Sequence, residues 1–231
     1  MTIAKNIEQI KSELKYAKLL VVSKTQSIES IKTCYDLGQR DFGENRVAEL
    51  KSKANELNNI CPEIRWHFIG HLQSKKIKDL LSIEKLFSIH SVDSFSLLEK
   101  IVQFNHSYNH TSENQISKAI GLFLEIKTTD ESSKSGMTDS DEIEASIKYI
   151  NDQKNSRFYL QGLMTMAPLE DDQLKSRAEI SFKKLKELGI LLQNKFSIVQ
   201  GLELSMGMSQ DYMIADNYQS NWVRVGSKVF N

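Results

Sequence analysis

Short apolar segments alternate with longer amphipathic segments along the whole chain. The short segments are rich in aliphatic, β-branched and aromatic residues, a composition typical of strands that are covered on both faces. Turn-forming and polar residues bound each of them. The predicted strands are Leu19–Ser23, Arg40–Phe42, Arg65–Ile69, Leu86–His90, Gly121–Lys127, Phe158–Leu163, Phe196–Leu202 and Trp222–Val225.

The segments between these strands carry apolar residues at helical spacing. In the longest one, Ile180, Leu185 and Leu188 lie among lysines and glutamates, as expected for a helix with one face against a sheet. Ser27 and Ser94 are predicted N-caps, because a serine hydroxyl accepts hydrogen bonds from the first free amides of a helix. The predicted helices are Ser27–Leu37, Glu44–Leu57, Ser74–Leu81, Ser94–Phe104, Asp139–Asn151, Asp171–Asn194 and Ser209–Asn217.

Strict alternation of strands and helices predicts a parallel sheet with right-handed crossovers. Eight such units close more naturally into a (β/α)8 barrel than into an open sheet, and 231 residues suit one barrel domain over residues 1–231. A doubly wound sheet is the alternative, but no GxGxxG motif follows the first strand. The segment Asn105–Lys118, rich in Asn, Ser and His, is expected to be an exposed loop.

Composition narrows the function classes. Thirty basic and thirty acidic side chains give a formal net charge of zero, which argues against a general nucleic-acid binder. The apolar runs are far shorter than the ~20 residues that span a bilayer, and the first ten residues lack the apolar core of a signal peptide. With only Cys34 and Cys61, no disulfide framework is expected. A cytoplasmic protein without membrane contact is therefore predicted.

A lysine stands at the carboxyl end of the first predicted strand, where Lys24 follows the apolar run Leu19–Val22. In a barrel, this end of the strand opens into the active-site mouth. An amine partly shielded from water there loses its proton more readily and attacks a carbonyl to form a Schiff base. A solvated lysine at a strand end is the alternative, because strand ends are usually wet.

Small residues follow the last two predicted strands, in the segments 205–209 and 224–227. Backbone amides exposed in such turns, together with serine hydroxyls, bind anions. Barrels often bind phosphate in the loops after strands seven and eight. A nucleophilic lysine combined with a phosphate site predicts a phosphorylated aldehyde as the ligand. Arg224 lies within an otherwise apolar strand, which favours a buried partner for its charge.

A metal site is not expected. His67 and His71 are four residues apart, but the intervening Gly70 disfavours a shared helical face, and no third ligand has suitable spacing. Met164 and Met166 are interpreted as core residues, with a ligand-lining role as the alternative.

Several motifs resemble those of the pyridoxal phosphate homeostasis proteins, and they occur in order from about residue 19 to the end of the chain. The chain departs from the family pattern at Lys75, Lys127 and Asn231. The motifs are Val21-Val22-Ser23-Lys24-Thr25, Phe42-Gly43-Glu44-Asn45, Trp66-His67-Phe68-Ile69-Gly70 with Leu72-Gln73-Ser74, Ser205-Met206-Gly207-Met208-Ser209, and Arg224-Val225-Gly226-Ser227 with Phe230.

This resemblance implies the barrel domain of the fold-type III pyridoxal phosphate enzymes, such as alanine racemase, without their second β-domain. It implies that Lys24 holds the cofactor as a Schiff base and that Arg224 faces the pyridine nitrogen. An arginine keeps this nitrogen unprotonated, so the ring is a weaker electron sink. The other implied site residues are Ser205, Gly226 and Ser227 for the phosphate, with Met208 and Ser209 nearby, then Asn45 and His67 lining the pocket, and Ser91 and Lys134 at its edge.

The resemblance implies a protein that holds pyridoxal 5'-phosphate, limits its free concentration and passes it to apo-enzymes, without robust catalysis of its own. A racemase-like enzyme is the alternative, but racemisation needs a second base, which the related racemases supply from the partner's extra domain. The chain ends at Asn231, directly after the eighth strand, so that domain is expected to be absent. A cofactor-free scaffold is a third alternative. A monomer or weak dimer is expected.

Overall fold

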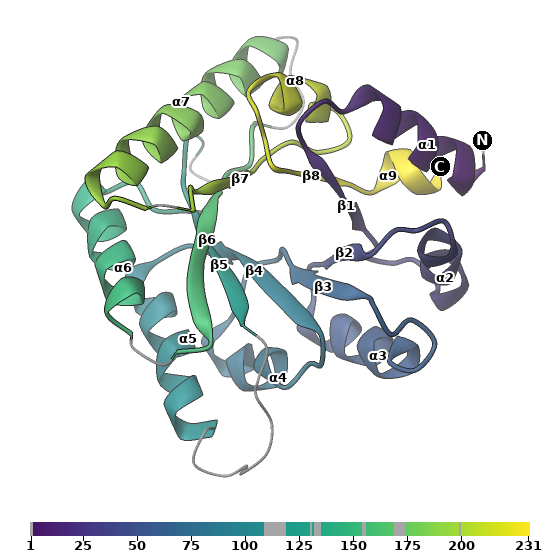
Figure 1. Cartoon of the computed structure of the whole chain (residues 1–231), viewed down its shortest axis with the longest axis horizontal. Helices are drawn as coiled ribbons and strands as arrows, with labels where there is room; N and C mark the ends of the chain where they lie inside the picture. Colours follow the sequence, from purple (N-terminus) through teal and green to yellow (C-terminus); the bar gives the residue numbers. More distant parts are fainter. Residues whose placement is uncertain are drawn as a thin grey trace.

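The computed structural model describes residues 2–108, 119–129, 131, 135–153, 156–168, 174–198 and 200–231. Eight parallel strands close into a barrel in sequence order, with the helices outside them (Figure 1). This architecture confirms the barrel that the alternating pattern predicts. The strands are β1 (Lys18–Val22), β2 (Asp41–Glu44), β3 (Arg65–Phe68), β4 (Leu86–Val92), β5 (Ile120–Glu125), β6 (Phe158–Met164), β7 (Glu203–Ser205) and β8 (Trp222–Val225).

Each predicted helix overlaps a helix of the structure. Both predicted N-caps are confirmed: Ser27 Oγ accepts from the amide of Ser30 at 3.2 Å, and Ser94 Oγ accepts from the amide of Leu97 at 3.3 Å. The helices are α1 (Ile3–Glu13), α2 (Ile28–Asp36), α3 (Val47–Leu57), a 3-10 turn (Ser74–Lys76), α4 (Ile77–Leu81), α5 (Phe95–Tyr108), α6 (Ser140–Asp152), α7 (Leu174–Lys195), α8 (Tyr212–Asn217) and α9 (Ser227–Phe230). Helix α1, which precedes β1, and the short α9 are additional to the prediction.

The seventh strand was predicted in the wrong place. The described residues of the predicted strand Phe196–Leu202 form no strand: Phe196 and Ser197 turn the chain after α7, Val199 lies outside the described residues, and the strand is Glu203–Ser205. The amide of Phe196 still bonds to the carbonyl of Leu192, and positive φ angles at Ser197 (50°) and Gly201 (76°) turn the chain. Apolar side chains of this turn pack against the core, which gives it the composition of a buried strand.

Several helix boundaries also differ from the prediction. The helix predicted from Ser209 begins at Tyr212. Glu44 completes β2, so the helix predicted from Glu44 begins at Val47. Helix α5 extends to Tyr108, so the first residues of the predicted loop Asn105–Lys118 are helical; 109–118 lie outside the described residues. The start of the predicted helix Asp171–Asn194, residues 171–173, also lies outside them.

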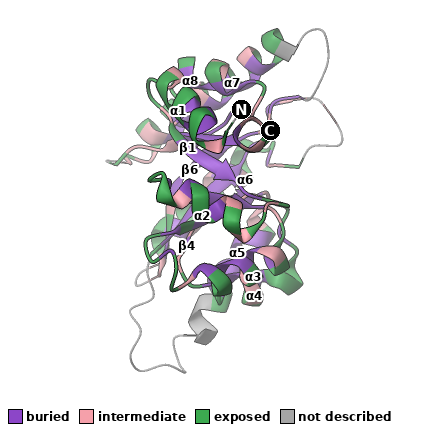
Figure 2. Ribbon diagram, turned by 90° about the vertical axis from the view of Figure 1, so that its right-hand side faces the viewer, coloured by how far each residue is buried: buried purple, intermediate pink, exposed green. Residues whose placement is uncertain are grey.

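The core has two parts, because strand side chains alternate between the two faces of the barrel wall. One part fills the space between strands and helices, and the strands are mostly buried while the outer helix faces are exposed (Figure 2). The other part lies inside the barrel and consists of Leu20, Val22, Phe123, Met164 and Trp222. In the described part of the chain, no helix is long and apolar enough to cross a membrane.

Candidate functional site

The first and last strands bring the predicted site residues together. β1 pairs with β8 in parallel, with Val21 opposite Val225, so the residues that follow each strand meet at the same end of the barrel. A Cβ atom on Gly226 would lie 3.0 Å from the carbonyl oxygen of Val22, two residues before Lys24. Lys24 itself is exposed, in the turn after β1. The sequence expectation of a partly shielded amine is therefore not met in this structure.

Arg224 carries a buried charge with neutral partners. Its side chain points into the barrel from β8, where Nη1 donates to Ser205 Oγ at 2.7 Å and Nη2 donates to the carbonyl of Thr165 at 2.9 Å. Among the described residues, no carboxylate lies within ion-pair distance of its guanidinium. Burial lowers the pKa of Arg224 to about 10, so the group remains charged at neutral pH. The predicted buried partner of Arg224 is thus Ser205, together with a carbonyl.

The turn after β7 is fixed by its backbone. Gly207 has φ of 96°, and a Cβ there would lie 2.5 Å from Cβ of Ala215, so the turn requires glycine. Its carbonyl accepts from the amide of Arg224 at 2.9 Å, and the amide of Met208 donates to Asp211 Oδ1 at 2.5 Å. These contacts tie the turn to β8 and hold Met208 half-buried at the mouth.

A second contact joins this turn to the end of β8. Ser209 Oγ accepts from the amide of Gly226 at 3.3 Å, and Ser227 begins α9 as an exposed residue. The close approach to Val22 leaves little room for a side chain at position 226. Serine hydroxyls and the free amides of a helical first turn are suitable donors for a phosphate group.

Below Arg224, a chain of hydrogen bonds descends along the barrel interior. Ser205 Oγ lies 2.8 Å from Nδ1 of His90, and Nε2 of His90 lies 2.8 Å from Ser88 Oγ. All three side chains are buried. Ser205 therefore holds Arg224 from below, and its hydroxyl is engaged on both sides.

The chain of hydrogen bonds continues from Ser88 to the opposite end of the barrel. Ser88 Oγ lies 2.7 Å from Nδ1 of His67, and Nε2 of His67 lies 3.0 Å from Asp41 Oδ1. Arg65 binds the Asp41 carboxylate through two nitrogens, at 2.6 and 2.5 Å. Burial would raise the pKa of Asp41, but the hydrogen bonds from His67 and Arg65 outweigh it and hold the pKa below its ordinary value.

One arrangement of protons gives every hydrogen bond between Arg224 and Asp41 a donor and an acceptor. A carboxylate only accepts, so His67 donates its Nε2–H to Asp41 and accepts at Nδ1 from Ser88. Ser88 in turn accepts from Nε2 of His90, whose Nδ1 accepts from Ser205. Burial lowers the pKa of His67 and of His90, so both imidazoles are neutral at neutral pH. Every bond then donates away from the Arg224 cation and towards the Asp41 anion.

His67 does not line the mouth as the sequence suggested. Its ring is completely buried inside the barrel, against the ring of Trp222 at 5.0 Å, and both its nitrogens face interior partners. It reaches the mouth only through His90 and Ser205. His71, by contrast, is exposed and contacts Asp93 at 3.2 Å. Among the described residues, no group of three potential metal ligands occurs.

Two further predicted residues lie around the loop after β3. Asn45 is half-buried, and Gly70 passes so close to it that a Cβ on Gly70 would lie 2.1 Å from the Asn45 carbonyl oxygen. Ser91 is buried and donates its hydroxyl to the carbonyl of Gly70 at 2.5 Å, so it supports the loop. Lys134 lies outside the described residues.

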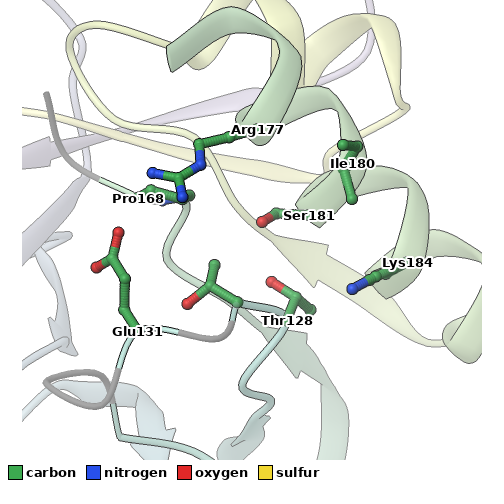
Figure 3. Close-up of a pocket in the computed structure, with 8 residues that line it drawn as sticks. Thr128, Glu131, Pro168, Arg177, Ile180, Ser181 and Lys184 are labelled. Carbon is green, nitrogen blue, oxygen red and sulfur yellow. The ribbon is translucent and has the colours of Figure 1, made fainter. Parts of the chain in front are cut away.

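A pocket of about 310 Å³ lies between α7 and the segments after β5 and β6 (Figure 3). Thr128 forms part of its wall and contacts Thr165 through their hydroxyls at 2.8 Å. None of the predicted site residues that the structure describes lines this pocket. Its lining residues are Thr128, Thr129, Glu131, Pro168, Arg177, Ile180, Ser181 and Lys184.

Sequence reasoning missed His90, Thr165 and Asp41. The available signal was the presence of polar residues at alternate positions of otherwise apolar strands, such as Ser88 and His90, which share one face of β4. The sequence motifs predicted site residues at the ends of β1 and β8 but gave no indication of the hydrogen-bond chain beneath Arg224.

Comparisons with known proteins agree with this geometry. The sequence model of the family described as alanine racemase, N-terminal domain, matches residues 1–231. A pyridoxal phosphate homeostasis protein of Schizosaccharomyces pombe is 36% identical over 92% of this chain and 82% of the relative. The human protein of that name is 37% identical over 92% of this chain and 75% of its own length. The structure of PipY of Synechococcus elongatus with pyridoxal phosphate bound is similar over all of both chains, with a TM-score of 0.85 and 29% identity.

Proposed function

The chain belongs to the pyridoxal phosphate homeostasis proteins of the alanine racemase N-terminal domain family, and from this we propose that it binds pyridoxal 5'-phosphate in the barrel mouth. Lys24 holds the cofactor as a Schiff base, and the protein keeps it in the cytoplasm for carriage without robust catalysis. Apo-enzymes that depend on this cofactor are the proposed recipients, and the protein acts as a monomer or weak dimer.

The observation that carries the proposal is the pairing of β1 with β8. It brings the turn that bears Lys24 next to Gly226 and to the strand of Arg224. The three groups match the three polar features of the cofactor: an amine for its aldehyde, a cation with neutral partners for its ring nitrogen, and a glycine–serine cradle for its phosphate. The likeness to PipY, whose structure holds pyridoxal phosphate, supports the same choice of ligand.

Each residue has a distinct part in this proposal. The Lys24 amine condenses with the aldehyde carbon and a water molecule leaves. Arg224 donates an N–H to the ring nitrogen. The remaining contacts come from Ser209, Gly226 and Ser227 on the phosphate, with Met208 and Asn45 beside the ring.

Two assignments from the sequence change in the proposal. The Ser205 hydroxyl is bonded to both Arg224 and His90, so Ser205 fixes the guanidinium rather than binding phosphate directly. His67 acts in the same indirect way, through His90. Both are positioning residues.

Arg224 also bears on the question of catalysis. A cation facing the ring nitrogen keeps that nitrogen unprotonated, and the ring then stabilises a carbanion poorly. The relatives are named homeostasis proteins, in agreement with a carrier role. Exchange of an amino acid α-proton in deuterated water, well above the rate with free cofactor, would instead favour the racemase-like alternative.

The test is a visible absorption spectrum of the purified protein with pyridoxal phosphate, followed by borohydride reduction and peptide mapping. We expect a Schiff-base band and a reduced adduct on Lys24. Adducts scattered over many surface lysines, or no band, would contradict the proposal.

A further inference from the structure

We propose that Lys53, together with Glu44 and Glu49, positions Lys24 by fixing the backbone on both sides of it. The inference rests on the proposed role of Lys24 and adds residues that do not touch the ligand. Lys53 and Glu49 come from α3 and Glu44 from the end of β2, so the cluster lies between the barrel wall and the helix layer.

Lys53 is buried and uses its ammonium group fully. Its Nζ donates to the carbonyl of Ser23 at 2.7 Å, to Glu44 Oε1 at 2.8 Å and to Glu49 Oε1 at 2.7 Å. An ammonium has three N–H donors, so all of them are engaged. The side chains of Lys53 and Glu44 are 8% and 0% exposed, which makes this pair a buried one.

The carboxylates of Glu44 and Glu49 also accept hydrogen bonds from the residues on either side of Lys24. Glu49 Oε1 accepts from the amide of Thr25 at 2.7 Å, and Glu44 Oε1 accepts from the hydroxyl of Ser23 at 2.7 Å. The Ser23 carbonyl belongs to the peptide group before Lys24, and the Thr25 amide belongs to the peptide group after it. The peptide groups on both sides of the Lys24 Cα are therefore hydrogen-bonded to the same cluster, Lys53, Glu44 and Glu49.

The turn needs such a restraint. Thr25 has φ of 64°, a left-handed conformation that a β-branched residue adopts only under constraint from its surroundings. Without the anchors on both sides, the turn would relax and the direction of the Lys24 side chain would change.

The composition of the cluster argues for a positional role rather than one in stability alone. Burial raises the pKa of Glu44, and its Oε2 is buried without a hydrogen-bond partner in the described part of the chain. Apolar side chains of similar volume often give equal or greater stability than a buried ion pair. Charged groups in this place supply directed bonds to two peptide groups, which apolar residues cannot.

The first experiment compares Lys53→Met with Lys51→Met, a lysine on the same helix that is half-exposed and pairs with Asp79 at 3.2 Å. Pyridoxal phosphate is added to each protein, and the rate of adduct formation on Lys24 is followed by absorbance and reductive mapping. We expect Lys53→Met to slow the reaction by about tenfold to a hundredfold, and Lys51→Met to match the wild type.

A Lys24 adduct that forms equally fast in Lys53→Met overturns this inference alone. A wild-type adduct that maps to a different lysine overturns the proposed function and this inference together. The two failures are therefore distinguishable.

A second experiment needs no cofactor and uses a milder change. Glu49→Ala removes the acceptor of the Thr25 amide, whereas Glu49→Gln keeps an oxygen in its place. Hydrogen exchange of this amide should be faster in Glu49→Ala and restored towards the wild-type rate in Glu49→Gln. Equal exchange in all three proteins would overturn the inference, even if Lys53→Met failed to fold.

Discussion

Ser205 Oγ lies 2.7 Å from Nη1 of Arg224, and among the described residues this hydroxyl, rather than a carboxylate, is the side-chain partner of a buried cation. The consequence is that, among the described residues, no ion-paired carboxylate neutralises the guanidinium, and in the proposed function this charge faces the ligand. The Asp41 carboxylate that balances the hydrogen-bond chain lies at the far end of the barrel, beyond two neutral histidines.

This relationship predicts a loss of stability in Ser205→Ala. The change leaves an N–H of Arg224 and Nδ1 of His90 unpaired in the interior, so the free energy of unfolding should fall by about 1.5–3 kcal/mol, the range for hydrogen bonds to charged groups. Urea denaturation measures the change. Ser52→Ala, at an exposed serine on α3, should stay within about 0.5 kcal/mol of the wild type. Equal effects of the two substitutions would mean that the Arg224–Ser205 bond contributes nothing.

Lys24→Ala should abolish the covalent adduct while the fold survives. Lys24 is exposed, so its loss should change the free energy of unfolding by no more than about 0.5 kcal/mol. Borohydride reduction followed by peptide mapping measures the adduct. Lys18→Ala is the matched control, because Lys18 begins the same strand at the opposite end of the barrel, over the Trp222 ring. A reducible adduct that persists at a different single lysine in Lys24→Ala would refute the assignment.

The end of β8 should discriminate between phosphorylated and unphosphorylated ligands. Ser209→Ala removes the hydroxyl beside the Gly226 amide, so the affinity for pyridoxal phosphate should fall by about tenfold, the equivalent of one hydrogen bond to a charged group. Equilibrium dialysis with pyridoxal, which lacks the phosphate, provides the control and should show no change. An equal loss for both ligands would place the phosphate elsewhere.

Much of the fold follows from local pattern, because a parallel barrel buries every strand on both faces. Seven predicted strands overlap the observed ones, whereas Phe196–Leu202 was misread, since a turn packed on the core has the same apolar composition as a strand. Sequence motifs supplied candidate site residues only where a motif lies at a strand end, as at Lys24 and Gly226. The burial state of Lys24 and the bond between Ser205 and Arg224 depend on how strands far apart in sequence are placed.

The buried histidines predict a pH dependence of stability with a definite sign. Burial lowers the pKa of His67 and His90 in the folded protein. In the unfolded protein both histidines have the ordinary pKa of about 6.5, so below that pH they are protonated in the unfolded state before they are protonated in the folded state. The free energy of unfolding should therefore be unaffected by these groups above that pH. Below it, stability should fall by about 1.4 kcal/mol per pH unit for each histidine.

His90→Gln separates this contribution from that of the carboxyl groups. Burial raises the pKa of Glu44, Glu125 and Asp211, and a carboxyl with a raised folded-state pKa gains stability on acidification, which opposes the effect of the histidines. Since His90→Gln retains those carboxyl groups, the difference in slope between the variant and the wild type isolates one histidine. Urea titrations between about pH 7.5 and 5 should show a shallower decline in His90→Gln. Identical slopes in His90→Gln and the wild type would mean that the interior of the barrel accepts the His90 proton freely.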